Sequence, residues 1–102
     1  MNTLPRAGYY EAVIQLRPKS QKVLRFIRDQ VRKRPGVFIS KEVVLKTGID
    51  IYLSSQRFAR DLGRKLKNHF QGELTISRAL YGVNRQTSRE VYRGTVLFRV
   101  KE

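Results

Sequence analysis

The sequence contains no cysteine and only one histidine, His69. Without thiols, neither a disulfide nor a thiolate metal site can form. The eight acidic residues are scattered along the chain, and no two of them have the spacing typical of metal ligands. We therefore expect neither a metal nor any other cofactor.

Long apolar runs and glycine-rich phosphate loops are also missing. No stretch approaches the ~20 residues of a membrane-spanning helix, and the first residues lack the apolar core of a signal peptide. We expect a cytoplasmic protein with no membrane partner. Nothing near His69 in the sequence supplies the partner that a general base needs. We expect no enzymatic activity and no small-molecule substrate; only turnover that is lost on changing His69 or Asp50 would reverse this interpretation.

Positive charge is what the sequence has in excess. The 22 Lys and Arg residues outnumber the eight Asp and Glu residues, which leaves a formal charge of +14 and a pI near 11.0. So large an excess disfavours a compact state unless a polyanion neutralises it, and nucleic acid is the leading candidate. With 102 residues, 40% of them hydrophobic, the chain is the size of one domain with a modest core.

The hydrophobic pattern predicts seven elements in the order β-α-β-β-α-β-β. Alternation with period two predicts strands at 9–17, 38–46, 49–53, 73–81 and 90–100. Apolar residues at helical spacing predict helices at 20–33 and 56–70, with N-caps at Ser20 and at Ser54 or Ser55. A polar loop at 82–89 separates the last two strands. In the first strand, Tyr10 shares the predicted core face with Ala12.

This order predicts a single α+β domain. The first six elements match the split βαβ, ferredoxin-like arrangement, in which two helices cover one face of an antiparallel sheet. The last strand would extend that sheet or pair back as a hairpin.

Both predicted helices carry basic residues opposite their apolar stripe. Such a face on one helix is often only a solvated surface, but the split βαβ arrangement places two of them on the same side of the sheet. Arginine outnumbers lysine there, and its planar fork suits phosphate oxygens. The predicted nucleic-acid-binding helix field consists of Arg25, Arg28, Arg32, Arg57, Arg60, Arg64 and Lys67.

The other face of the sheet is a second candidate surface. Arg93 and Arg99 in the last strand alternate with its apolar residues and face away from the predicted core. Tyr9 and Tyr52 would add aromatic rings, and an open sheet face with such groups is how one common RNA-binding module stacks bases. The alternative to base stacking is that these tyrosines pack against a neighbouring domain.

The polar loop is the third candidate surface. It carries Arg85 and Arg89, and it is long enough to reach a ligand. An ordinary hairpin loop explains it equally well.

Four sequence segments occur in an order and at a spacing that match a known family. They are Tyr-Tyr-Glu-Ala-Val-Ile-Gln-Leu-Arg at 9–17, Thr-Gly-Ile-Asp-Ile-Tyr-Leu-Ser-Ser at 47–55, Ser-Arg-Ala-Leu-Tyr-Gly at 77–82 and Val-Tyr-Arg-Gly-Thr-Val-Leu-Phe-Arg at 91–99. Together they resemble the middle region of the large ribosomal subunit export adaptor family, nonsense-mediated decay protein three. The short and strongly basic sequence resembles the archaeal branch of this family. The second of these segments is the most specific.

The resemblance implies a factor that docks on the large ribosomal subunit late in its assembly, with ribosomal RNA and ribosomal proteins as partners. The family's zinc-binding cysteine pairs and Leu-rich export signal are absent from these 102 residues. Zinc and export are therefore not carried over, and we expect either one domain of a larger protein or a reduced homologue.

Two hypotheses about function remain open. In the first, the domain binds ribosomal RNA phosphates through its basic helix faces without reading sequence. In the second, it is a protein-interaction module whose sheet face docks a ribosomal protein or a neighbouring domain.

Overall fold

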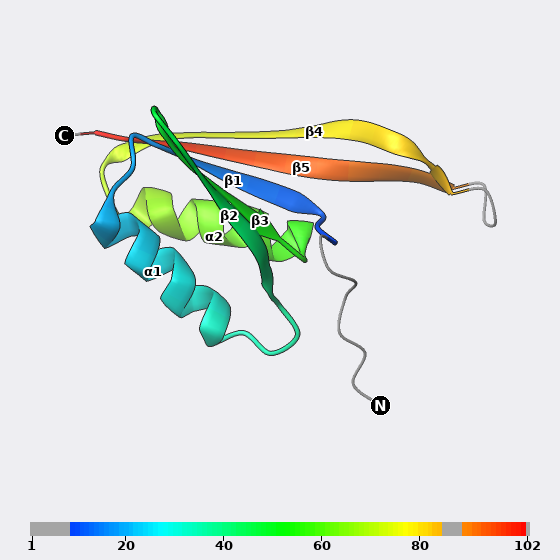
Figure 1. The fold of residues 1–102 in the computed structure, drawn as a ribbon, viewed down its shortest axis with the longest axis horizontal. Coiled ribbons are helices and arrows are strands. Elements are labelled where there is room, and N and C mark those ends of the chain that lie inside the picture. The colour runs from blue at the N-terminus through cyan, green and yellow to red at the C-terminus, as the bar shows by residue number, and fades with distance from the viewer. Residues whose placement is uncertain (1–8, 85–88, 102) are drawn as a thin grey trace.

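A computed structural model describes residues 9–84 and 89–101. In this part of the chain, two helices cover one face of a five-stranded sheet (Figure 1). The elements are β1 (Ala12–Arg17), α1 (Gln21–Arg32), β2 (Ile39–Leu45), β3 (Gly48–Leu53), α2 (Gln56–His69), β4 (Gly72–Asn84) and β5 (Arg89–Val100). The predicted α+β class and element order are confirmed.

The strand order differs from the prediction. The sheet runs β2-β3-β1-β5-β4, and β1 pairs with β5 in parallel, so the prediction of an entirely antiparallel sheet is wrong at this pair. In the ferredoxin-like arrangement β4 would lie beside β1, whereas here β5 takes that place and β4 forms the edge. Burial explains the exchange: β5 carries the fully buried Val96 and Phe98, while Ile76 of β4 is 36% exposed.

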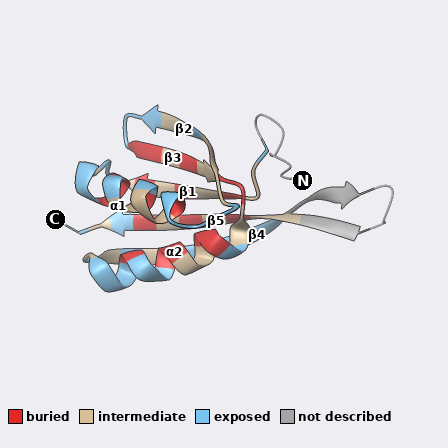
Figure 2. Cartoon of the chain, turned by 90° about the horizontal axis from the view of Figure 1, so that it is seen from below, coloured by how far each residue is buried: buried red, intermediate tan, exposed pale blue. Residues whose placement is uncertain are grey.

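The core lies between the sheet and the two helices (Figure 2). Alternate side chains of the central strands, such as Ile14, Ile51 and Phe98, meet the apolar stripes of the helices, such as Ile27 and Leu66. Burying one such side chain contributes roughly 1.5–3 kcal/mol. No helix of the described residues covers the opposite face of the sheet, which we call the open face (Figure 1).

Both helices begin where the sequence predicts. The Ser20 hydroxyl accepts a hydrogen bond from the Val23 N–H at 3.3 Å, and the Ser55 hydroxyl accepts one from the Phe58 N–H at 3.1 Å. These caps satisfy N–H groups that have no partner within the helix. Ser54 has another task, because its buried hydroxyl accepts a hydrogen bond from the Phe38 N–H at 2.8 Å.

Tyr10 does not lie on the core face, contrary to the prediction. The chain bends at Glu11 and β1 begins only at Ala12, so the alternation of β1 does not extend back to residue 10. The Tyr10 ring instead packs edge-on against Tyr52, with 4.8 Å between ring centroids. Tyr52 alternates with buried residues of β3, which places this contact on the open face.

The last two strands are longer than predicted and form a ribbon that extends past the rest of the molecule (Figure 1). Gly82, Val83 and Asn84 pair with β5, so the predicted loop is wrong at these residues. The reason is that cross-strand hydrogen bonding continues where the side-chain pattern alone does not indicate a strand. Arg85 lies outside the described residues, and Arg89 is described only as the first residue of β5.

Candidate nucleic-acid interface

The helix field lies on the outer surface of α1 and α2. All of its members except Arg60 are exposed, and Arg60 is partly buried. Arg60 is also in hydrogen-bond range of Gln56, one turn earlier, at 3.4 Å. The apolar stripes of both helices are buried, which turns the basic residues outward.

The seven residues of the helix field are spread across the two helices. Arg28 reaches β2, where its Nε donates to Glu42 Oε2 at 2.9 Å and its Nη2 donates to Oε1 at 2.5 Å. Lys67 donates to the carbonyl oxygen of Gly72, at the start of β4, at 2.9 Å. Because β2 and β4 are opposite edges of the sheet, the helix field spans the whole width of the helical layer.

Several of these cations have carboxylate partners. Arg32 and Lys33 both pair with Asp29, and Arg64 pairs with Asp61 at 3.2 Å. Hydrogen bonds from Lys33 and then Arg32 hold the pKa of Asp29 below its usual range, so this carboxylate is charged at neutral pH. Ion pairs between such solvent-accessible groups are weak, so a phosphate can replace the carboxylate as the partner of the arginine at little cost.

Arg25 and Arg57 differ from their neighbours. Among the described residues, neither makes a hydrogen bond or an ion pair, and both are exposed. Arg25 borders a hollow of about 540 Å³ on the helical layer, together with Lys22, Phe26 and Phe70. These two arginines are the cations of the helix field most available to an external anion.

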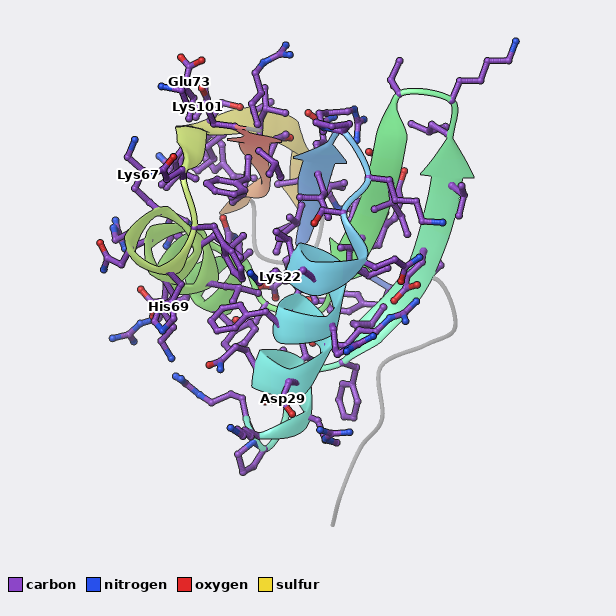
Figure 3. All side chains as sticks on the ribbon, turned by 90° about the vertical axis from the view of Figure 1, so that its left-hand side faces the viewer. Lys22, Asp29, Lys67, His69, Glu73 and Lys101 are labelled. Atoms are coloured by element: carbon purple, nitrogen blue, oxygen red, sulfur yellow. The ribbon has the colours of Figure 1, made fainter. Side chains whose placement is uncertain are left out.

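The single histidine of the sequence, His69, contacts a backbone carbonyl oxygen and an aromatic ring. His69 lies at the end of α2 (Figure 3), with its Nδ1 3.1 Å from the Lys65 carbonyl oxygen and its ring 4.9 Å from that of Phe26. In the part of the chain that is described, no three His, Asp or Glu residues gather in a way that could hold a metal ion. Neither of the described helices is long and apolar enough to cross a membrane.

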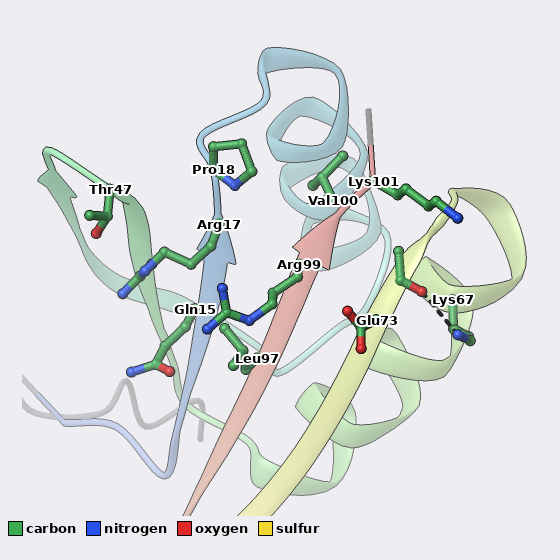
Figure 4. Close-up of a pocket in the computed structure, with 11 residues that line it drawn as sticks. Gln15, Arg17, Pro18, Thr47, Lys67, Glu73, Leu97, Arg99, Val100 and Lys101 are labelled. Atoms are coloured by element: carbon green, nitrogen blue, oxygen red, sulfur yellow. Dashed lines mark hydrogen bonds between the residues drawn. The ribbon is translucent and has the colours of Figure 1, made fainter.

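The open face carries a groove of about 1010 Å³ where β1 and β5 end (Figure 4). Four cations line it, namely Arg17, Lys67, Arg99 and Lys101, against the single carboxylate of Glu73. We call this the cationic groove. Arg17 is held in place, since its Nη2 donates to Asp50 Oδ1 at 2.6 Å and its Nη1 to the Ile49 carbonyl at 3.2 Å.

A second cluster lies on the open face at the opposite end of β1. The Arg93 guanidinium stands 4.0 Å from the centroid of the Tyr10 ring, and the Lys41 ammonium stands 4.5 Å from that of Tyr52. With the contact between the two tyrosines, these residues form an aromatic–cation cluster across β2, β3 and β5. Cation–π contacts of this kind contribute roughly 0.5–2 kcal/mol each.

Comparison with known families gives one match that extends over nearly the whole chain. The model of the NMD3 family, second domain, matches residues 9–100. The chain belongs to the NMD3 family. The match includes all seven helices and strands, and it confirms the resemblance carried by the four sequence segments. No curated protein matches the chain.

Membership indicates a ribosome-related function, because the NMD3 family is associated with the large ribosomal subunit. It is also consistent with a role in the biogenesis or export of that subunit. The match is to the second domain of the family.

Sequence reasoning found part of the open face of this NMD3 domain. It named Arg93, Arg99 and Tyr52, because alternation with apolar residues marks a strand's outward side. It missed the Arg17–Asp50 pair and the proximity of Lys101 to Lys67, which depend on strand neighbours far apart in sequence. No local signal could have revealed them.

Proposed function

We propose that this NMD3 domain is a non-enzymatic, cytoplasmic module that binds the large ribosomal subunit by neutralising ribosomal RNA phosphates with its helical layer. The observation that carries the proposal is the state of the helix field. It combines two arginines that have no partner among the described residues, Arg25 and Arg57, with two others whose aspartate partners are weakly held.

Phosphate binding suits such a surface. Each phosphate that replaces a bulk counterion adds to the affinity, and the dependence on salt grows with the number of contacts. The aspartates beside the arginines offset the repulsion between these like charges, and their weak ion pairs give way when a polyanion approaches. Contacts from arginine side chains to phosphates carry no sequence information by themselves, which favours binding without sequence readout.

The test is charge reversal at the two unpartnered arginines. We expect the Arg25→Glu/Arg57→Glu variant to bind purified large subunits at least tenfold more weakly in 100 mM salt, with a flatter dependence on salt. The matched control is Lys19→Glu/Lys46→Glu, which makes the same change of charge at exposed residues outside the helices. Equal loss in both variants, or no loss in the first, would overturn the proposal.

A second candidate is docking of a ribosomal protein or a neighbouring domain through the open face. The observation that favours it is that partly buried apolar residues, such as Val43 and Leu97, lie on this face without a helix over them among the described residues. Val43→Asp would then abolish large-subunit binding, while the Arg25→Glu/Arg57→Glu variant would bind normally.

A further inference from the structure

The cationic groove contains two arginines at the same register of neighbouring strands. Arg17 of β1 and Arg99 of β5 are register partners, and both lie on the open face. Neighbouring strands are only ~4.8 Å apart, so the two positive charges repel each other unless anions compensate them.

The protein neutralises only one of the two. Arg17 has a side chain that is 17% exposed and pairs with Asp50 at 2.6 Å. Arg99 is exposed and has no hydrogen-bond or ion-pair partner among the described residues. Glu73 is its register partner on β4, yet the Arg99 guanidinium extends over β1 toward Gln15 and Arg17, away from Glu73 (Figure 4).

Backbone packing keeps the groove in this shape. A Cβ atom on Gly48 would lie 2.0 Å from the Leu16 carbonyl oxygen and 2.8 Å from Arg17 Cδ, so only glycine lets Arg17 lie against β3. At the other end, a Cβ on Gly72 would lie 2.3 Å from the Arg99 carbonyl oxygen. Lys101 is anchored there through its N–H, which donates to the Gln71 carbonyl at 2.9 Å.

We propose that the cationic groove binds a phosphodiester of single-stranded RNA, with Arg99 and Lys101 contacting the phosphate and the ion pair of Arg17 with Asp50 forming a fixed wall beside them. The identity of the polyanion rests on the proposed function, but Arg17, Arg99 and Lys101 lie outside the helical layer, while Lys67 belongs to both surfaces. A planar guanidinium without a partner, next to a second fixed one, suits the oxygens of a phosphate.

The rest of the open face favours RNA over an acidic peptide. The aromatic–cation cluster lies on the same face at the other end of β1, where Arg93 already stacks on the Tyr10 ring at 4.0 Å. A nucleotide offers both a phosphate and a flat base, and unpaired bases stack on tyrosine rings and guanidinium planes. An acidic peptide would use only the groove.

The experiment measures binding of a fluorescein-labelled, unstructured 12-nucleotide RNA by anisotropy. We expect Arg99→Gln to weaken binding about fivefold and to reduce the salt slope by about one, as the loss of one phosphate contact requires. Arg99→Lys should recover part of the affinity. The matched control, Arg34→Gln, removes the same charge in the turn after α1, outside both the helix field and the groove, and should change affinity less than twofold.

The outcomes separate this proposal from the previous one. Wild-type affinity in Arg99→Gln overturns the phosphate site, whatever the helix variants do. Loss in Arg99→Gln with normal binding by Arg25→Glu/Arg57→Glu supports the groove and removes the helical layer as the contact. If polyglutamate of equal charge displaces the RNA at equal concentration, the groove takes carboxylates of a protein instead and the RNA proposal fails.

Discussion

Glu11 connects Tyr9, which precedes β1, with the N-terminus of α2. Its Oε1 accepts a hydrogen bond from the Gln56 N–H at 3.0 Å, and its Oε2 accepts one from the Tyr9 hydroxyl at 2.5 Å. A carboxylate is favourable at the N-terminus of α2, where the helix dipole is positive. The bend at Glu11 that disrupts the predicted alternation therefore has a structural purpose.

Tyr9 gives a pH prediction at the residue scale. The hydrogen bond to Glu11, followed by partial burial, raises the pKa of Tyr9 to about 12. Because the folded pKa is above the ordinary value of 10.0, the stabilisation is complete below pH 10 and is lost as the pH rises toward 12. In Glu11→Gln the acceptor is neutral, and we expect the Tyr9 pKa to fall toward 10.

Absorbance at 295 nm measures this ionisation. The difference between each protein and its Tyr9→Phe counterpart isolates the Tyr9 signal from that of the other tyrosines. A Tyr9 pKa that stays near 12 in Glu11→Gln would show that burial, not the carboxylate, is responsible.

At the scale of elements, α2 packs on the sheet through a glycine. A Cβ atom on Gly63 would lie 2.8 Å from Val96 Cγ1 and 3.1 Å from Leu74 Cδ1. Val96 is 1% exposed and has a stiff branched side chain, so it cannot move aside easily. The small residue therefore sets how closely α2 approaches β4 and β5.

The substitution Gly63→Ala sets two effects against each other. Alanine in a helix is favoured over glycine by ~1 kcal/mol, whereas overpacking a core costs roughly 1–3 kcal/mol. We expect overpacking to win, with a net loss of about 1 kcal/mol in the free energy of unfolding, measured in urea. Asn68→Ala, at an exposed position of α2, is the control and should stabilise slightly. A gain in Gly63→Ala would contradict the close approach.

At the scale of the whole molecule, the charge of +14 affects the stability of the folded state. Self-repulsion lowers the stability of the compact state, and salt screens it over a Debye length of ~10 Å at 0.1 M. We expect the Tm to rise between 10 and 200 mM NaCl and to rise further with a short RNA, because ligand binding stabilises the folded state. Differential scanning calorimetry measures both effects.

A charge variant provides the control for the salt effect. Lys19→Glu/Lys46→Glu lowers the net charge at exposed positions, and its Tm should depend less on NaCl. A Tm that falls with salt in the wild type would mean that its ion pairs, such as Arg28 with Glu42, outweigh the self-repulsion.

Much of the fold could be predicted at the level of elements, and less of the candidate site. The caps at Ser20 and Ser55 and the buried helix stripes were predicted because they depend on residues within one or two turns. The position of Tyr10 was not predicted. The bend at Glu11 depends on a hydrogen bond from the N–H of Gln56 at the start of α2, 45 residues further along the chain.

The sequence by itself determined the element order, the helix caps, the buried faces and the strongly basic surface, since each follows from local periodicity and composition. Only the tertiary structure decided that β5 lies beside β1 and that Arg99 is therefore the register partner of Arg17. Strand neighbours are chosen by long-range packing, which here places β5, with its buried Val96 and Phe98, next to β1. The positions of the charges across the sheet follow from that choice.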